Sequence, residues 1–244
     1  MHYGIIAAGE GSRLRQEGIE RPKPLVLLNG VPMIERLIRQ MIGAEAESVS
    51  VIVNEQMTEV ADFLRSLAPS LPVPLQLVVK STPSSMHSFY ELSSLMKGKG
   101  RFILTTVDTI FHSQPFARYA KAFAEGPEEV DCMMGITGFV DDEKPLYVAT
   151  LPPDVNPGEE NRLYQIIGFF DDPTPGVRFI SGGIYGLDGS AISILEECME
   201  KGVSRMRNFQ RALTAGGLNV KGYDLGKIVD VDHAEDIRTA EQFV

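Results

Sequence analysis

Short aliphatic runs alternate with amphipathic segments along the first 110 residues. The runs rich in β-branched and aliphatic side chains predict strands at residues 3–8, 49–53, 75–79 and 101–107. Between them, apolar side chains recur at helical spacing and predict helices at residues 32–42, 57–67 and 88–96. Because strands and helices alternate along the chain, we expect a parallel sheet that is covered by helices.

The second half of the chain has a less regular pattern. Apolar runs predict strands at residues 131–139, 146–151, 163–169, 178–187 and 220–225, and helical spacing predicts helices at residues 192–201, 204–215 and 233–243. Residues 152–161 are rich in Pro, Asp, Asn and Glu, so we expect a surface excursion within a hairpin there. The length suits one core. We therefore expect one α/β domain over residues 1–244, with a Rossmann-like, mostly parallel mixed sheet and helices on both faces.

The composition is that of an ordinary globular protein, with 43% hydrophobic and 23% charged residues. The net charge of −10 disfavours attraction to nucleic acid or to anionic lipid, so we expect neither as a partner. The start of the chain has a short apolar run without a basic leader, which indicates a first strand rather than a signal peptide. We interpret Cys132 and Cys198 as buried thiols and expect a cytoplasmic location.

A glycine loop follows the first predicted strand. Gly9 and Gly11 permit a tight turn and let backbone N–H groups approach phosphate oxygens. The loop and the segment after it carry the cations that an acidic protein needs around a triphosphate, namely Arg13, Arg15, Arg21 and Lys23. Two glycines alone would also suit an ordinary turn. The third glycine of a dinucleotide-binding loop is replaced by Leu14, which disfavours a Rossmann dehydrogenase.

Lys23 stands between two prolines, Pro22 and Pro24, which stiffen the backbone and hold its ammonium group in a fixed place. We expect Lys23 and Arg13 to be exposed cations that stabilise negative charge on a leaving pyrophosphate. Exposed cations contribute little to folding. Replacing either residue with alanine should therefore lower turnover severely and leave thermal stability nearly unchanged.

Four blocks of sequence together resemble the nucleotidyltransferases that activate sugar phosphates. The first is Ala7-Ala-Gly-Glu-Gly-Ser-Arg-Leu14 followed by Pro22-Lys-Pro-Leu25. The second, at residues 104–108, is similar to the strand that presents the family's first metal-binding aspartate, although Val107 replaces a common glycine. The others are residues 180–185, which resemble the acceptor-pocket segment, and residues 230–236, which resemble the family's DxDxxED run.

The resemblance implies a set of site residues and a fold of the nucleotide-diphospho-sugar transferase type. The residues implied for nucleotide binding are Ala7, Ala8, Gly9, Gly11, Ser12, Arg13, Lys23, His87 and Ser88. The catalytic set is Arg13, Lys23, Asp108 and Asp232. Gly182 and Gly183 are implied for the acceptor, whose phosphate could bind to Lys144 or Arg178. Arg205 and Arg207 are further candidates, with a solvated helix face as the alternative for both. Residues 1–110 would form the nucleotide-binding half and residues 111–244 the acceptor-binding half.

Asp108 and Asp232 are the expected ligands of a Mg²⁺ cofactor, because this ion prefers a few carboxylates together with phosphate oxygens and water. Asp230 is the second choice and would act from outside the coordination shell. The alternative for Asp108 is a turn or helix cap. For Glu235 and Asp236 we favour the role of an acidic start to the last helix.

The expected activity is transfer of a nucleoside monophosphate from a nucleoside triphosphate to a sugar phosphate or similar small acceptor, with release of pyrophosphate. Residues 86–92 are similar to the base-side segment of bacterial choline-phosphate cytidylyltransferases, with His87 and Ser88 in place of two asparagines. One alternative is therefore a cytidylyltransferase for phosphocholine or an alditol phosphate. Another is a non-catalytic nucleotide-sensing module. We interpret the aromatic residues Phe89, Tyr90, Phe169 and Phe170 as core rather than as a cage for choline.

Overall fold

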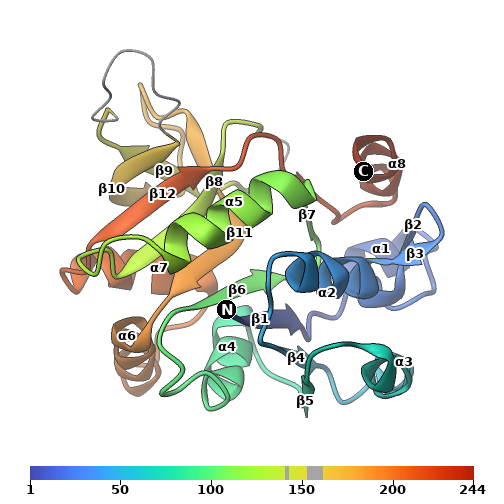
Figure 1. The fold of residues 1–244 in the computed structure, drawn as a ribbon. Helices are drawn as coiled ribbons and strands as arrows, with labels where there is room; N and C mark the ends of the chain where they lie inside the picture. Colours follow the sequence, from blue (N-terminus) through green and yellow to red (C-terminus); the bar gives the residue numbers. More distant parts are fainter. Residues whose placement is uncertain (141–142, 153–161) are drawn as a thin grey trace.

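Four neighbouring strands of the main sheet are parallel (Figure 1). The computed structural model describes residues 1–140, 143–152 and 162–244. Strand β1 (His2–Ala7) pairs with β4 (Ser48–Val53) on one side and with β6 (Phe102–Thr106) on the other, and β5 (Leu75–Val79) lies beyond β4. Because these strands run in one direction, their carboxyl ends meet at one edge of the sheet, where open α/β folds bind ligands.

The remaining strands are mainly antiparallel and curl into a ring. Strand β11 (Phe179–Leu187) runs antiparallel to β6 and to β8 (Cys132–Thr137), and β12 (Val220–Asp224) runs parallel to β8. Strand β10 (Leu163–Phe170) pairs with β12 and with β9 (Tyr147–Thr150), and β9 returns to pair with β11. The sheet order is therefore β5-β4-β1-β6-β11-β8-β12-β10-β9, with the last five strands closed on themselves.

Helices cover both faces of the sheet, which confirms the predicted α/β fold. One face carries α2 (Met33–Gly43), α3 (Thr58–Leu67) and α5 (Ser113–Ala124), and the other carries α4 (Ser85–Ser93), α6 (Gly189–Glu200) and α7 (Met206–Ala215). The predicted periodicity explains the packing: in α2, Ile34, Leu37, Ile38 and Met41 are all at most 3% exposed. Short 3-10 turns occupy Lys23–Leu25 and Ala68–Ser70.

The carboxyl edge is assembled from both ends of the chain. Here α1 (Ser12–Gln16) and the hairpin of β2 (Leu27–Leu28) and β3 (Val31–Pro32) lie beside the closing helix α8 (Ala234–Phe243) (Figure 1). A small cluster of buried side chains joins them, formed by Leu14, Val26, Leu28, Met33, Ile110, Val229, Val231 and Ala240. This cluster fixes the last acidic run against the glycine loop.

The predicted elements are found with shifted ends, and two helices, α1 and α5, were missed. Helix α4 begins at Ser85 rather than at residue 88, because Met86 also faces the core. Helix α5 was not predicted, although Phe116, Tyr119, Ala120 and Phe123 bury one helical face. Its Pro115 lies in the first turn, where a missing N–H costs no helical hydrogen bond. The excursion predicted at residues 152–161 falls, apart from Pro152, outside the described residues.

Both cysteines are buried free thiols, as predicted. The four aromatic residues predicted as core divide evenly. Phe89 and Phe169 are buried, whereas Tyr90 and Phe170 are 38% and 44% exposed, so the prediction is wrong for these two. No helix within the described residues is long and apolar enough to cross a bilayer.

Candidate active site

A cavity of about 650 Å³ lies over the glycine loop at the carboxyl edge of the parallel strands. We call it the loop cavity. Its lining includes the predicted residues Ala8, Gly9, Gly11, Ser12, Arg13, Lys23, Ser88, Asp108 and Asp232. The structure therefore brings together predicted residues from both ends of the sequence, such as Ala8 and Asp232. The predicted basic loop and both predicted metal ligands share one cavity.

Gly11 is required by both backbone conformation and packing. Its φ angle is +61°, in the left-handed region that favours glycine. A Cβ atom at this position would lie 3.0 Å from Cβ of Lys23. The loop and the segment of Lys23 can therefore approach only because residue 11 has no side chain.

Replacing Gly11 with alanine is expected to destabilise the protein by about 1–3 kcal/mol, the usual cost of holding a residue with a side chain in this conformation. Thermal unfolding would measure the effect. Gly9→Ala is the matched control, because a Cβ atom at Gly9 meets nothing within 4 Å. Equal midpoints for the two variants would contradict the packing argument.

Lys23 is the centre of a network of charges. Its Nζ atom lies 2.6 Å from Oδ2 of Asp108 and 2.6 Å from Oδ1 of Asp232. Nη1 of Arg13 donates to the other carboxylate oxygen of Asp232 at 2.5 Å. Lys23 is only 8% exposed, so the expectation of an exposed lysine is wrong; the side chain of Arg13, at 45%, is exposed as expected. Burial follows from the close approach of Lys23 to Gly11.

Two short strands position the carboxylates. After β6 the chain passes through Asp108 into β7 (Thr109–Ile110), which pairs with β13 (Val229–Asp230). The N–H of Val231 donates to the carbonyl of Asp108 at 3.1 Å, which brings the next residue, Asp232, to the cavity. The side chain of Asp236 then accepts the N–H of Asp232 at 2.9 Å. Asp236 thus caps the start of α8, close to its predicted role.

The electrostatics of this network keep its members charged. Burial opposes ionisation of Asp108, but the ammonium group of Lys23 outweighs it and holds the pKa of Asp108 below its usual value. Burial likewise opposes protonation of Lys23, but Asp108, Asp232 and Asp230 outweigh it and raise the pKa of Lys23. The lysine is therefore a permanent cation between two carboxylates.

The carboxylates suit a divalent cation, because those of Asp108 and Asp232 already converge on one positive charge. Within the described residues, no group of three or more His, Cys, Asp or Glu side chains is arranged to hold a metal. Two carboxylates fit Mg²⁺, which usually takes its other ligands from phosphates and water. Asp230 lies outside the described lining of the loop cavity and, with Asp108, lines a second cavity.

The second cavity lies beside the bend in β11 and has a volume of about 500 Å³. We call it the bulge cavity. The predicted Gly182 and Gly183 line it, at the point where the register of β11 against β8 shifts. A Cβ atom on Gly183, whose φ is +71°, would lie 2.4 Å from Oγ1 of Thr109. The two glycines therefore let the bent strand reach the segment that carries Asp108.

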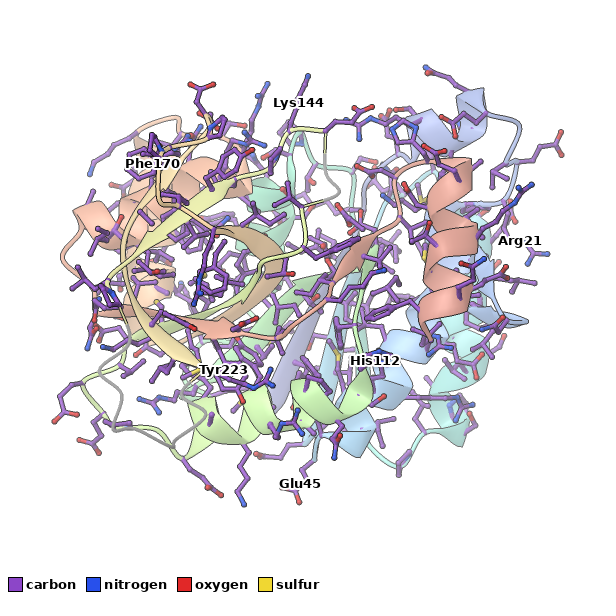
Figure 2. The ribbon with its side chains drawn as sticks, turned by 90° about the horizontal axis from the view of Figure 1, so that it is seen from above. Arg21, Glu45, His112, Lys144, Phe170 and Tyr223 are labelled. Carbon is purple, nitrogen blue, oxygen red and sulfur yellow. The ribbon has the colours of Figure 1, made fainter. Side chains whose placement is uncertain are left out.

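Three of the four predicted acceptor-binding cations line the bulge cavity, namely Lys144, Arg205 and Arg207. Lys144 lies at its rim on the upper side of the molecule in Figure 2. Arg205 has a φ of +73°, a strained conformation for a residue with a side chain. Arg178 is placed elsewhere: its guanidinium group lies over the ring of Phe179 and donates to the hydroxyl of Tyr164.

Four further residues of the predicted nucleotide site lie outside the described lining of both cavities. Ala7 is 1% exposed in the core beneath the loop, and His87 turns toward Ser84, with Nδ1 2.8 Å from Oγ. Both lie outside the described lining of the loop cavity, so nucleotide binding by these two residues stays a prediction. Arg15 lines a separate surface pocket, and Arg21 points to solvent at the edge of the molecule (Figure 2).

Three hydroxyl residues, Thr82, Ser84 and Ser85, also line the loop cavity, although none of them was predicted to bind the nucleotide. Thr82 and Ser84 lie between β5 and α4, and Ser85 is the first residue of α4. Polar side chains that follow the carboxyl end of a parallel strand face the ligand edge of the sheet. Ser85 also lines the bulge cavity, as do Thr106 and Asp108. These shared residues form the wall between the two cavities.

Comparison with known families gives the cavities a context. A family model described as the MobA-like NTP transferase domain matches residues 4–153, which is more than half of the chain. The chain belongs to this family. The matched stretch contains the glycine loop, Lys23 and Asp108. The resemblance to nucleotidyltransferases is therefore confirmed.

Relatives of this MobA-like chain span several named transferases. It is 26% identical over 247 residues to a bifunctional IPC transferase and DIPP synthase of Rubrobacter xylanophilus, covering 98% of the chain and 51% of that relative. The chain thus spans about half the length of that relative. A 2-aminoethylphosphonate cytidylyltransferase of Lancefieldella rimae is 45% identical over 49 residues, 20% of each protein. The solved inositol-1-phosphate CTP transferase of T. maritima has the same fold, with a TM-score of 0.77 at 18% identity over 99% of this chain and 94% of that one.

Proposed function

We propose that this protein transfers a nucleoside monophosphate from a nucleoside triphosphate to a sugar phosphate or similar small phosphorylated acceptor and releases pyrophosphate. The observation that carries the proposal is the place of Asp108 in the wall shared by the two cavities. A triphosphate in the loop cavity and an acceptor phosphate in the bulge cavity would meet at this residue. Such a reaction needs alignment and neutralisation of charge, and no covalent step on the protein.

Six charged residues of the two cavities would have roles in this reaction. Asp108 and Asp232 would hold Mg²⁺, which supplies positive charge at the reacting phosphate. Lys23 and Arg13 would bind the triphosphate, and the glycine loop offers backbone N–H groups to it. The basic residues of the bulge cavity, Lys144 and Arg205, would bind the phosphate of the acceptor.

Two of the alternatives receive less support. A choline headgroup favours an aromatic cage. In the described lining of the bulge cavity the aromatic residues are Phe139 and Tyr185, and Nζ of Lys227 already lies 4.4 Å from the centre of the Phe139 ring. A non-catalytic sensing module would be favoured if the departures at residues 87 and 107 disturbed the site, yet the carboxylates of Asp108 and Asp232 still converge.

The chain would work as one domain over residues 1–244, because the loop cavity is built from both ends of the sequence. Burial of both thiols is consistent with a cytoplasmic location, which we also propose.

A screen for pyrophosphate release tests the proposal. Each of the four common nucleoside triphosphates is combined with sugar, alditol, choline and aminoethyl phosphates in the presence of Mg²⁺. We expect release with at least one pair from the wild type and none above background from Asp108→Asn. Tight binding of a nucleoside triphosphate without release for any pair would favour the sensing module.

A further inference from the structure

The inner wall of the bulge cavity contains an amide that is only half satisfied. Gln210 of α7 is 2% exposed and lines the cavity. The hydroxyl of Ser181, on β11, donates to Oε1 of Gln210 at 2.8 Å. This bond fixes the orientation of the amide, so that Nε2 points away from Ser181.

Nε2 of Gln210 makes no hydrogen bond with any residue that the structure describes. Among the described residues, two side-chain nitrogens are fully buried and have no hydrogen-bond partner: Nε of Arg36 and Nε2 of His233. Because Nε2 of Gln210 is not one of these, it borders the open space of the cavity. Nε2 is therefore available to donate to a ligand in this cavity.

A donor held in this way is a strong selector. Leaving it unpaired when a ligand displaces water should lower the use of that ligand by roughly 10- to 100-fold. An acceptor with a hydroxyl group at this point incurs no such loss. The neighbouring side chains Thr106, Thr109 and Thr137 add hydroxyl groups to the same cavity. Its chemistry matches a ligand that carries several hydroxyl groups.

We propose that Gln210 is a specificity-determining residue that donates from Nε2 to a hydroxyl group on the body of the acceptor, with Ser181 as its positioning residue. The acceptor is then a phosphorylated sugar or polyol. This inference rests on the proposed function, since it assigns the acceptor to the bulge cavity. An aminoalkyl or choline phosphate offers no hydroxyl group on its body. Such a ligand would instead use the carboxylate of Asp230 in the same cavity.

The test compares acceptors that differ by one hydroxyl group. Values of kcat/KM are measured for the best sugar or polyol phosphate and each of its monodeoxy analogues. The wild type should discriminate against one analogue by roughly 10- to 100-fold. Gln210→Met keeps the length of the side chain but removes the donor. This variant should therefore have the same kcat/KM for the parent acceptor and for that analogue. Ser181→Ala should reduce the same discrimination, with the KM for the nucleotide unchanged.

Asn208→Ala is the matched control, because Asn208 lies on the same helix and bonds to Ser204 and Arg211 rather than to the cavity. It should keep the discrimination of the wild type. Discrimination that persists in Gln210→Met, or a wild type that discriminates against none of the analogues, would overturn the role of Gln210. Circular dichroism and thermal midpoints would identify any variant that is misfolded; if Gln210→Met is misfolded, Ser181→Ala decides.

Direct binding separates this inference from the proposed function. Titration calorimetry with the same acceptors needs no turnover. A wild type that releases no pyrophosphate, yet binds hydroxylated acceptors in a way that depends on Gln210, would contradict the transfer reaction and support the assignment of Gln210. Turnover with phosphocholine or 2-aminoethylphosphonate alone would support transfer and overturn the hydroxyl contact. If the wild type shows no turnover and binds none of the acceptors, both the transfer reaction and the role of Gln210 are overturned.

Discussion

Replacing Lys23 with alanine is expected to lower kcat by roughly 100- to 1,000-fold, the usual loss when one group that stabilises transition-state charge is removed. The same change should also destabilise the fold, because Nζ of Lys23 is the cation that the carboxylates of Asp108 and Asp232 share, at 2.6 Å from each. The side chains of these acids are 23% and 32% exposed, so water screens part of their repulsion. We expect a loss of about 1–3 kcal/mol.

Mg²⁺ should restore much of the stability of Lys23→Ala without restoring its turnover. A divalent cation between the carboxylates replaces the lost positive charge, but it does not replace the lysine on the triphosphate. Scanning calorimetry with and without Mg²⁺, together with steady-state pyrophosphate release, would measure both effects.

Two other cations are controls for Lys23. Arg21→Ala should change neither property, because Arg21 is exposed at the edge of the molecule. Arg13→Ala should lower turnover but hardly affect stability, since the side chain of Arg13 is 45% exposed. Turnover of Lys23→Ala within a few-fold of the wild type would remove Lys23 from the mechanism.

The sequence predicted the parallel half of the fold well, because the signals there are local. An apolar run such as residues 49–53 marks a buried strand, and the spacing of Ile34, Leu37 and Ile38 marks a helix face. The glycine loop could also be predicted, since its residues are close in sequence. These features need no knowledge of distant contacts.

Features that arise from contacts between distant residues were not predictable in the same way. The burial of Lys23 depends on Gly11 on one side and on Asp108 and Asp232 on the other, and the last of these is 209 residues away. The amide of Gln210 reads in sequence as one polar position on an amphipathic helix. Only the pairing of β11 with β8 and the packing of α7 bring it to a cavity beside Ser181.

The neighbouring acids Asp230 and Asp232 were distinguished in sequence only by position, and the structure now gives them different surroundings. Val229 and Val231 are 1% and 0% exposed, so the alternation expected of an extended segment is confirmed. Asp232 lines the loop cavity and shares Lys23 with Asp108. Asp230 opposes Thr109 in the short strand pair and lines the bulge cavity. One acid therefore faces the triphosphate side and the other the acceptor side.

Asp232→Asn is expected to abolish turnover supported by Mg²⁺, and Asp230→Asn to weaken it by roughly 10- to 100-fold, the scale for losing a group outside the coordination shell. An amide keeps the shape of the side chain but removes the negative charge that the metal needs. Nucleotide binding measured by calorimetry should lose its dependence on Mg²⁺ in Asp232→Asn and in Asp108→Asn, and keep it in Asp230→Asn. Because Asp230 lines the bulge cavity, its variant should also change the KM for the acceptor. Kinetics of the three variants across one Mg²⁺ titration would decide, and the assignment is wrong if Asp230→Asn proves the more damaging change.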